Sequence, residues 1–161
     1  MTTPEDLEKK LWKAVKSDRT IMLGLERPGA GDAQPMTAIV EDDTRGPIWI
    51  FSAKDVDLVQ AINGEEAAVA QFASKGHDLF ATMHGTLTLQ NDPATVERLW
   101  NPFIAAWYEG GRSDPKLRLL RLDLHRAHVW LNENSLFAGL KLLMGSDPKK
   151  QYADKTADIR L

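Results

Sequence analysis

The stretch IWIFSAKDVDLVQAIN, residues 48–63, combines a strand pattern with a helix pattern and no connecting loop between them. Mainly hydrophobic residues fill its start and then recur at helical spacing up to Ile62, after which Asn and Gly form a typical helix stop. The start of a helix offers unpaired N–H groups and a partial positive charge, and both favour a phosphate. The predicted helix begins with Lys54, Asp55 and Asp57, so one cation and two acids compete at that position.

The segment before this stretch predicts a helix and then three strands. Residues 4–17 carry hydrophobic side chains at helical spacing, and Thr3 with Asp6 forms a capping pair at their start. The three expected strands are residues 19–26, 36–42 and 47–53. Because each connection is too short for a parallel crossover, these strands are expected to form an antiparallel meander.

The middle of the chain predicts two more strands, residues 66–74 and 79–90. In the second of them hydrophobic and polar residues alternate, so one face is expected to be core and the other wet or at an interface. Residues 92–108 follow with hydrophobic residues at helical spacing. Pro102 is expected to bend or break that helix, because proline removes a backbone donor.

The last part of the chain predicts two further strands, residues 116–125 and 127–132, and a final helix after residue 135. Residues 146–161 are polar and are expected to form a C-terminal arm. Six or seven antiparallel strands with interspersed helices predict a mainly β fold, a small antiparallel barrel with helices at its ends. The length suits one domain over residues 1–161.

Composition narrows the class of protein. Hydrophobic residues make up 43% and charged residues 27%, which is typical of a globular domain. A net charge of -3 argues against nucleic acid as a partner, and no apolar run approaches the roughly 20 residues that span a bilayer. The first residues are unlike a secretory signal, and without cysteine there is no disulfide or thiolate chemistry. A cytoplasmic location is the expectation.

The histidines and serines do not predict a catalytic or metal site. His125 and His128 are three residues apart on expected strand, which would place them on opposite faces. His84 belongs to the polar face of its strand and His77 to a turn. No serine lies in a nucleophile-elbow pattern. No metal is therefore expected.

Tryptophan is the more informative residue type. Trp100 and Trp107 are seven residues apart, which would place them on one face of a helix. Such a pair serves either core or dimer packing, or forms a wall for a planar ligand, which aromatic side chains suit.

Four segments of the chain resemble the general-stress-protein branch of the pyridoxamine 5'-phosphate oxidase-like, FMN-binding split barrels. The segments are QPMTA (34–38), IWIFSAKD (48–55), LWNPFIAAWYEGG (99–111) and DPKLRLLRLDLHRAHVWL (114–131). The resemblance runs from about residue 18 to residue 144 in the family's order, and the Trp-Asn-Pro piece followed by the aromatic-glycine piece is its most distinctive part. It implies a split β-barrel of six or seven antiparallel strands.

The resemblance also implies a flavin site, with FMN ahead of FAD. The flavin ring would lie along the second and third strands, where Met36 and Thr37 would contact it. Phe51, Ser52 and Lys54 would lie near the ribityl chain and the phosphate, which sits at the start of the short helix.

The family implies a homodimer with two flavin sites at the subunit interface. Phe80 would lie near the site, and Trp107 or Trp130 would come from the partner subunit. No residue is identified as a general base, so no catalytic residue is predicted.

Three residues depart from the family pattern at the expected phosphate site. Arginine is common where Gln34 stands, a basic residue where Leu58 stands, and a polar or basic residue where Asp57 stands. An acid about 6 Å from a phosphate costs roughly 1–3 kcal/mol. A missing charge-assisted hydrogen bond costs roughly 1.5–3 kcal/mol more. Together these losses predict binding weaker by a factor on the order of 100 to 10,000.

Two features would offset that loss. Asp55 and Asp57 would do less harm if they capped the helix. Another cation could also reach the phosphate, and the candidates are Lys54, Arg45, Arg112 and Arg118.

Three functions remain open from the sequence. The first is a flavin-dependent oxidoreductase, in which the cofactor does the redox chemistry. The second is a stress-protection module that holds a flavin or another planar ligand without turnover, and the third is a dimer whose flavin site has decayed.

Overall fold

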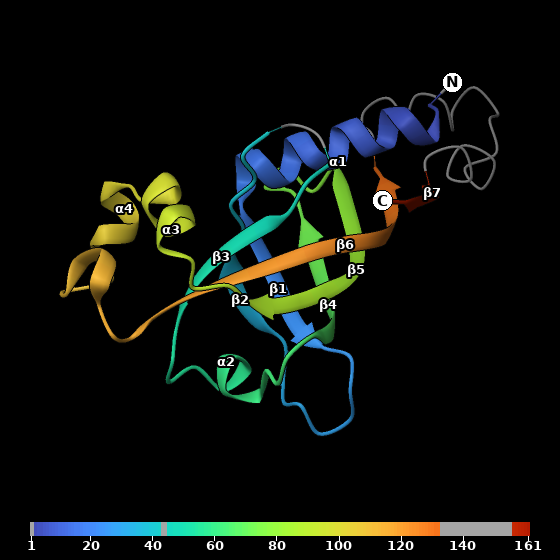
Figure 1. Cartoon of the computed structure of the whole chain (residues 1–161). Coiled ribbons are helices and arrows are strands. Elements are labelled where there is room, and N and C mark those ends of the chain that lie inside the picture. Colours follow the sequence, from blue (N-terminus) through green and yellow to red (C-terminus); the bar gives the residue numbers. More distant parts are fainter. Residues whose placement is uncertain (1, 43–44, 133–155) are drawn as a thin grey trace, which may run out of the picture.

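The computed structural model describes residues 2–42, 45–132 and 156–161, which form one sheet with helices around it (Figure 1). The strands are β1 (Thr20–Leu25), β2 (Gln34–Thr37), β3 (Ile48–Ala53), β4 (Glu66–Ala73), β5 (Leu79–Leu89), β6 (Leu117–Leu131) and β7 (Thr156–Arg160). The helices are α1 (Pro4–Asp18), α2 (Asp57–Ala61), α3 (Pro93–Leu99), α4 (Pro102–Ala105) and the 3-10 turn η1 (Gly111–Ser113).

All paired strands are antiparallel, in the order β2-β1-β4-β5-β6-β3, and β7 also pairs with β6. The sheet is open, and its two end strands approach each other at one isolated bridge between Ile39 and Trp49. At that bridge Ile39 N–H donates to the Trp49 carbonyl at 2.8 Å, and Trp49 N–H donates back at 2.9 Å. The predicted mainly antiparallel split barrel of six or seven strands is confirmed.

The predicted meander of the first three strands is confirmed only in part. β1 and β2 pair antiparallel as expected, but β3 pairs with β6 and meets the segment after β2 only at the Ile39–Trp49 bridge. Strand β2 begins at Gln34, earlier than expected, and its regular part ends at Thr37. Strand β2 has only four residues, so it can form only a short ladder with β3. Pro35 also lacks the backbone N–H that a strand paired on both of its edges would need to donate. The longer β6 provides six consecutive partners for β3, from Leu122 to Leu117.

Strand β6 is continuous, although two strands were predicted there. The register shifts between His84 and Gly85 of β5, where His125 is the extra residue on β6. The bulge also overturns the expectation that His125 and His128 lie on opposite faces. His125 Nε2 lies 2.7 Å from the Thr86 hydroxyl, and His128 is the cross-strand partner of Thr82, on the same face of β5.

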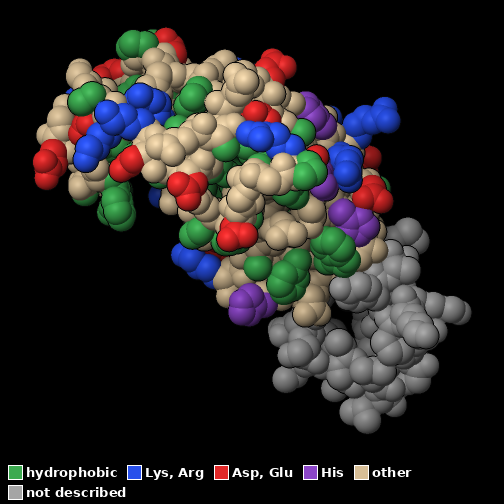
Figure 2. Space-filling view, turned by 90° about the horizontal axis from the view of Figure 1, so that it is seen from below, with side chains coloured by type: hydrophobic (Ala, Val, Ile, Leu, Met, Phe, Trp, Pro, Cys, Tyr) green, Lys and Arg blue, Asp and Glu red, His purple; other side chains and the backbone are tan. Residues whose placement is uncertain are grey.

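The histidines serve separate contacts on this outer face of the sheet. His128 Nδ1 lies 2.6 Å from an Asp158 carboxylate oxygen, and His84 contacts Glu26. Figure 2 shows histidine side chains spread over one face, with hydrophobic side chains beside some of them. Within the described ranges, no group of three or more His, Cys, Asp or Glu residues could hold a metal ion.

The helices follow their local signals at the N-terminus and at Pro102. Thr3 and Asp6 form the predicted capping box of α1. The expected break at Pro102 separates α3 from α4, and Asn101 caps α4 by accepting from Ile104 N–H at 3.0 Å. The expectation that Trp100 and Trp107 share one helix face is therefore wrong, because the break places them on separate segments.

Two other predicted segments differ from expectation. Helix α2 begins at Asp57, so Lys54 and Asp55 lie in the preceding turn. Residues 156–160 of the expected arm form β7, which pairs with β6 and places Ile159 in the core. The final helix predicted after residue 135 lies outside the described residues.

The hydrophobic core has two parts. The larger lies between the inner face of the sheet and the buried stripe of α1, Leu7, Leu11, Trp12 and Val15. The smaller lies on the outer face of β3 and β6, under α3 and the segment after α4. None of the helices in the described part of the chain is long and apolar enough to cross a membrane.

We expect Gly85→Ala to destabilise the fold by about 1–3 kcal/mol, because its Cβ would press into the backbone of Asp123 and Leu124 at the bulge. Gly46→Ala is the matched control, since no atom lies within 4 Å of its added Cβ. Urea unfolding of both variants measures the effect. Equal midpoints for the two variants would show that the bulge tolerates a side chain.

Candidate functional site

A cavity of about 380 Å³ opens between the β2 and β3 end of the sheet and the α4 segment. Small-molecule sites usually have volumes of about 300–1,000 Å³. We call it the aromatic cavity, and its lining residues are Arg19, Thr37, Ile39, Phe51, Ser52, Ala53, Val56, Asn101, Phe103, Ile104, Trp107 and Tyr108. Its walls are therefore mainly apolar and aromatic, with a few polar groups.

The inner wall of the aromatic cavity is fixed by Tyr108. Its hydroxyl donates to the Ser52 carbonyl at 2.7 Å, which ties the segment after α4 to β3. Burial raises the pKa of Tyr108 to about 12, and the charge of Asp114 adds to this effect. Tyr108 is thus a neutral donor at physiological pH. Its ring also contacts Phe51 and Trp100, with centroids 6.4 and 6.0 Å away.

The outer wall of the cavity is unusually exposed. Phe103 is 81% exposed and Trp107 is 85% exposed, although both line the cavity. Large aromatic side chains are rarely left this open, and a patch of them marks a ligand or protein interface.

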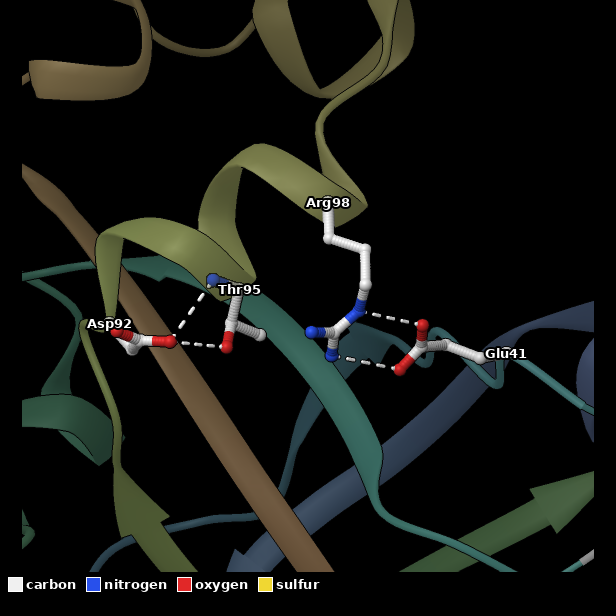
Figure 3. A network of polar contacts seen from close by, with 4 residues as sticks. All are labelled: Glu41, Asp92, Thr95 and Arg98. Carbon is white, nitrogen blue, oxygen red and sulfur yellow. Dashed lines mark hydrogen bonds and ion pairs between the residues drawn. The ribbon is translucent and has the colours of Figure 1, made fainter.

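Two separate sets of polar contacts involve α3: one caps its start, and the other joins it to the connection between β2 and β3 (Figure 3). Asp92 accepts from Thr95 N–H at 3.1 Å and from its hydroxyl at 2.7 Å, and these bonds lower the pKa of Asp92. Arg98 donates two hydrogen bonds to Glu41, at 2.9 and 3.1 Å, which joins α3 to the connection between β2 and β3.

The structure separates the eight residues predicted for the flavin site. Four of them line the aromatic cavity: Thr37, Phe51, Ser52 and Trp107. Phe80 and Trp130 line a different hollow of about 310 Å³ on the outer face of β4, β5 and β6. Neither cavity is lined by Met36, which packs against the main core, or by Lys54, which is exposed in the turn before α2.

The turn before α2 does not have the arrangement expected at a phosphate site. No side chain caps α2, so neither Asp55 nor Asp57 has the capping role that would have offset its charge. Leu58 is 3% exposed and belongs to the main core, so a basic residue at this position would not face a phosphate.

Three of the four cations considered for the phosphate have other partners. Arg45 pairs with Glu8 of α1, and Arg112 pairs with Glu97 and lies over the Trp100 ring. Arg118 donates to backbone carbonyls of its own segment.

The sequence did not single out four of the lining residues, Arg19, Asn101, Phe103 and Tyr108. Asn101, Phe103 and Tyr108 belong to the LWNPFIAAWYEGG segment, so that segment was the available signal for them. Arg19 follows the last residue of α1 and offers no signal of its own.

Comparison with known proteins gives a consistent picture. Residues 6–153 match the family described as pyridoxamine 5'-phosphate oxidase like. A general stress FMN/FAD binding protein from Xanthomonas citri is 54% identical with a TM-score of 0.77, over 81% of this chain and 92% of that one. A protein described as general stress protein 26 from Jannaschia is 26% identical with a TM-score of 0.78, over 98% and 99%. None of the curated proteins matches.

The raised pKa of Tyr108 predicts a pH dependence of stability. The folded state holds this proton more tightly than the unfolded chain, whose tyrosine titrates near 10. The contribution is therefore complete below pH 10, and it is lost as pH rises towards about 12, by about 2–3 kcal/mol. Tyr108→Phe lacks this proton, so its unfolding free energy should fall less between pH 10 and 12. Parallel curves for the two proteins in urea unfolding would contradict the assignment.

Proposed function

The chain belongs to the pyridoxamine 5'-phosphate oxidase-like family, and on this premise we propose that it binds a flavin in the aromatic cavity as a general stress protein. The proposal rests mainly on one observation: four of the residues predicted for the flavin site line that cavity together, namely Thr37, Phe51, Ser52 and Trp107. FMN is the proposed flavin, because the family resemblance places a phosphate, and not a dinucleotide, at the start of α2. The general stress FMN/FAD binding protein at 54% identity supports a flavin in general.

The residues of the cavity fit the ring of a flavin. Phe51, Phe103 and Trp107 offer flat apolar surfaces, and Thr37 and Asn101 offer side chains that hydrogen-bond to ring oxygens and nitrogens. The phosphate end fits less well, because Asp57 is exposed beside the turn and Leu58 is buried. The ring is therefore expected to contribute more of the affinity than the phosphate does.

A bound flavin supplies hydride and electron transfer, while the chain orients the ring and limits access of water. The lining residues offer no acid–base group for neutral pH, since the Tyr108 hydroxyl is committed to Ser52 and its pKa is about 12. We therefore propose an oxidoreductase limited to electron exchange through the flavin. Holding a flavin without turnover is the second candidate, and the same missing acid–base group favours it.

We further propose that the chain acts as a homodimer. In one copy the predicted residues are divided between the aromatic cavity and the hollow that holds Phe80 and Trp130. If a second copy placed its Trp130 surface against the aromatic cavity, the predicted residues of both hollows would lie at one site. Met22, Phe80 and Trp107 are exposed by 41%, 36% and 85%, and such surfaces are commonly covered by a partner.

Flavin binding is tested by titrating the purified protein with FMN and following the quenching of flavin fluorescence. We expect micromolar or tighter binding, and Trp107→Ala should weaken it about tenfold because a wall of the cavity is lost. Leu89→Ala is the control, since Leu89 is also exposed but lines neither cavity. Wild-type protein that takes up no FMN at micromolar concentration would overturn the proposal. Bleaching of the bound flavin by NADH or NADPH would separate the oxidoreductase from the binding module.

The dimer is tested by light scattering together with a second tryptophan variant. The expected mass is about twice 18.0 kDa. Trp130→Ala should weaken FMN binding about threefold or more in the dimer, although Trp130 does not line the aromatic cavity of its own copy. A monomeric mass, or FMN affinity that Trp130→Ala leaves unchanged, would argue against a shared site.

A further inference from the structure

Among the described residues that line the aromatic cavity, Arg19 is the one that carries a charge. Within the described part of the chain, its side chain has no hydrogen-bond or ion-pair partner. None of the described carboxylates lines the same cavity. The cavity therefore combines aromatic walls with a single uncompensated positive charge, and this combination suits a planar molecule that carries an anionic group.

The backbone fixes the position of Arg19 from two sides. Its N–H donates to the Val15 carbonyl at 2.9 Å and ends α1, and its carbonyl accepts from Ala38 N–H at 2.6 Å, just after β2. A cation whose Cα is held in this way costs less to order when a ligand binds than one on a free loop.

The strand register separates Arg19 from Gln34, the position where the family commonly has arginine. Thr20, the next residue, pairs with Thr37, whereas Gln34 pairs with Leu23, three residues further along β1. At about 3.3 Å per residue, Arg19 stands roughly 13 Å along the strand from the position opposite Gln34. The charge that this chain presents to the cavity therefore comes from a different position than the family's arginine.

We propose that Arg19 binds the carboxylate of a planar aromatic substrate whose ring lies beside the flavin at the aromatic cavity. This inference rests on the proposed function, because it names the substrate class of the same cavity. The guanidinium group donates two parallel hydrogen bonds to a carboxylate, and the flat ring of the flavin offers a surface for the attached ring. The flavin phosphate, which the family resemblance expects at the start of α2, is the other source of an anion, and the test below distinguishes the two.

The test compares 2-naphthoate with its neutral amide, 2-naphthamide, by calorimetric titration of the full-length protein with and without FMN. Wild-type protein should bind the carboxylate about tenfold to a hundredfold more tightly than the amide. Arg19→Gln should lose that preference. Arg160→Gln is the matched control, because Arg160 is exposed on β7 and lines neither described cavity. Arg19→Gly is a second variant whose folding is secure, since the φ of 65° at this position suits glycine.

The outcomes separate this inference from the proposed function. A preference for naphthoate that survives in both Arg19 variants, or is absent in the wild type, would overturn it. A second contrary outcome concerns the flavin phosphate, which FMN has and riboflavin lacks. If Arg19→Gln weakened the binding of FMN but not of riboflavin, and kept the preference for naphthoate, Arg19 would bind the flavin phosphate and the inference would be wrong. Failure of the wild type to bind FMN would overturn the proposed function alone, since the naphthoate titration without FMN still reports on Arg19.

Discussion

The pairing of β3 with β6 is the constraint on which the rest of the structure depends. Once β3 occupies that edge of β6, it meets β2 at the single bridge between Ile39 and Trp49. The sheet therefore stays open between two strands that would otherwise close it. The aromatic cavity lies at this opening, so the topology that leaves backbone unpaired there also creates the space for a ligand.

The α3 and α4 segment turns that opening into a site. It packs on the outer face of β3 and β6 through Val96, Leu99 and Tyr108, and Arg98 ties it to Glu41 on the way from β2 to β3. The same segment leaves Phe103 and Trp107 in contact with solvent. A rigid frame thus presents an apolar surface to solvent. Covering that surface with a ligand or a second copy would be favourable, because apolar area would be removed from water.

Local sequence signals predicted the elements whose conformation depends on neighbouring residues. The capping pair of α1, the alternation along β5 and the break at Pro102 are cases of this kind, and all three were confirmed. Partners distant in sequence were not predictable in this way. The pairing of β3 with β6 depends on residues about seventy positions apart, and the bulge opposite Gly85 joins two predicted strands into one. Part of the site was unpredictable for the same reason. The burial of Leu58 and the position of Arg19 at the cavity depend on tertiary packing between segments that are distant in the sequence.

The central claim is that the open edge between β2 and β3 is where the chain binds a flavin. A crystal structure of the full chain with FMN tests it most directly. The account predicts electron density for the isoalloxazine ring in the cavity between Thr37 and Trp107. Density for the ring only in the hollow at Met22 and Thr82, or none at saturating FMN, would contradict it.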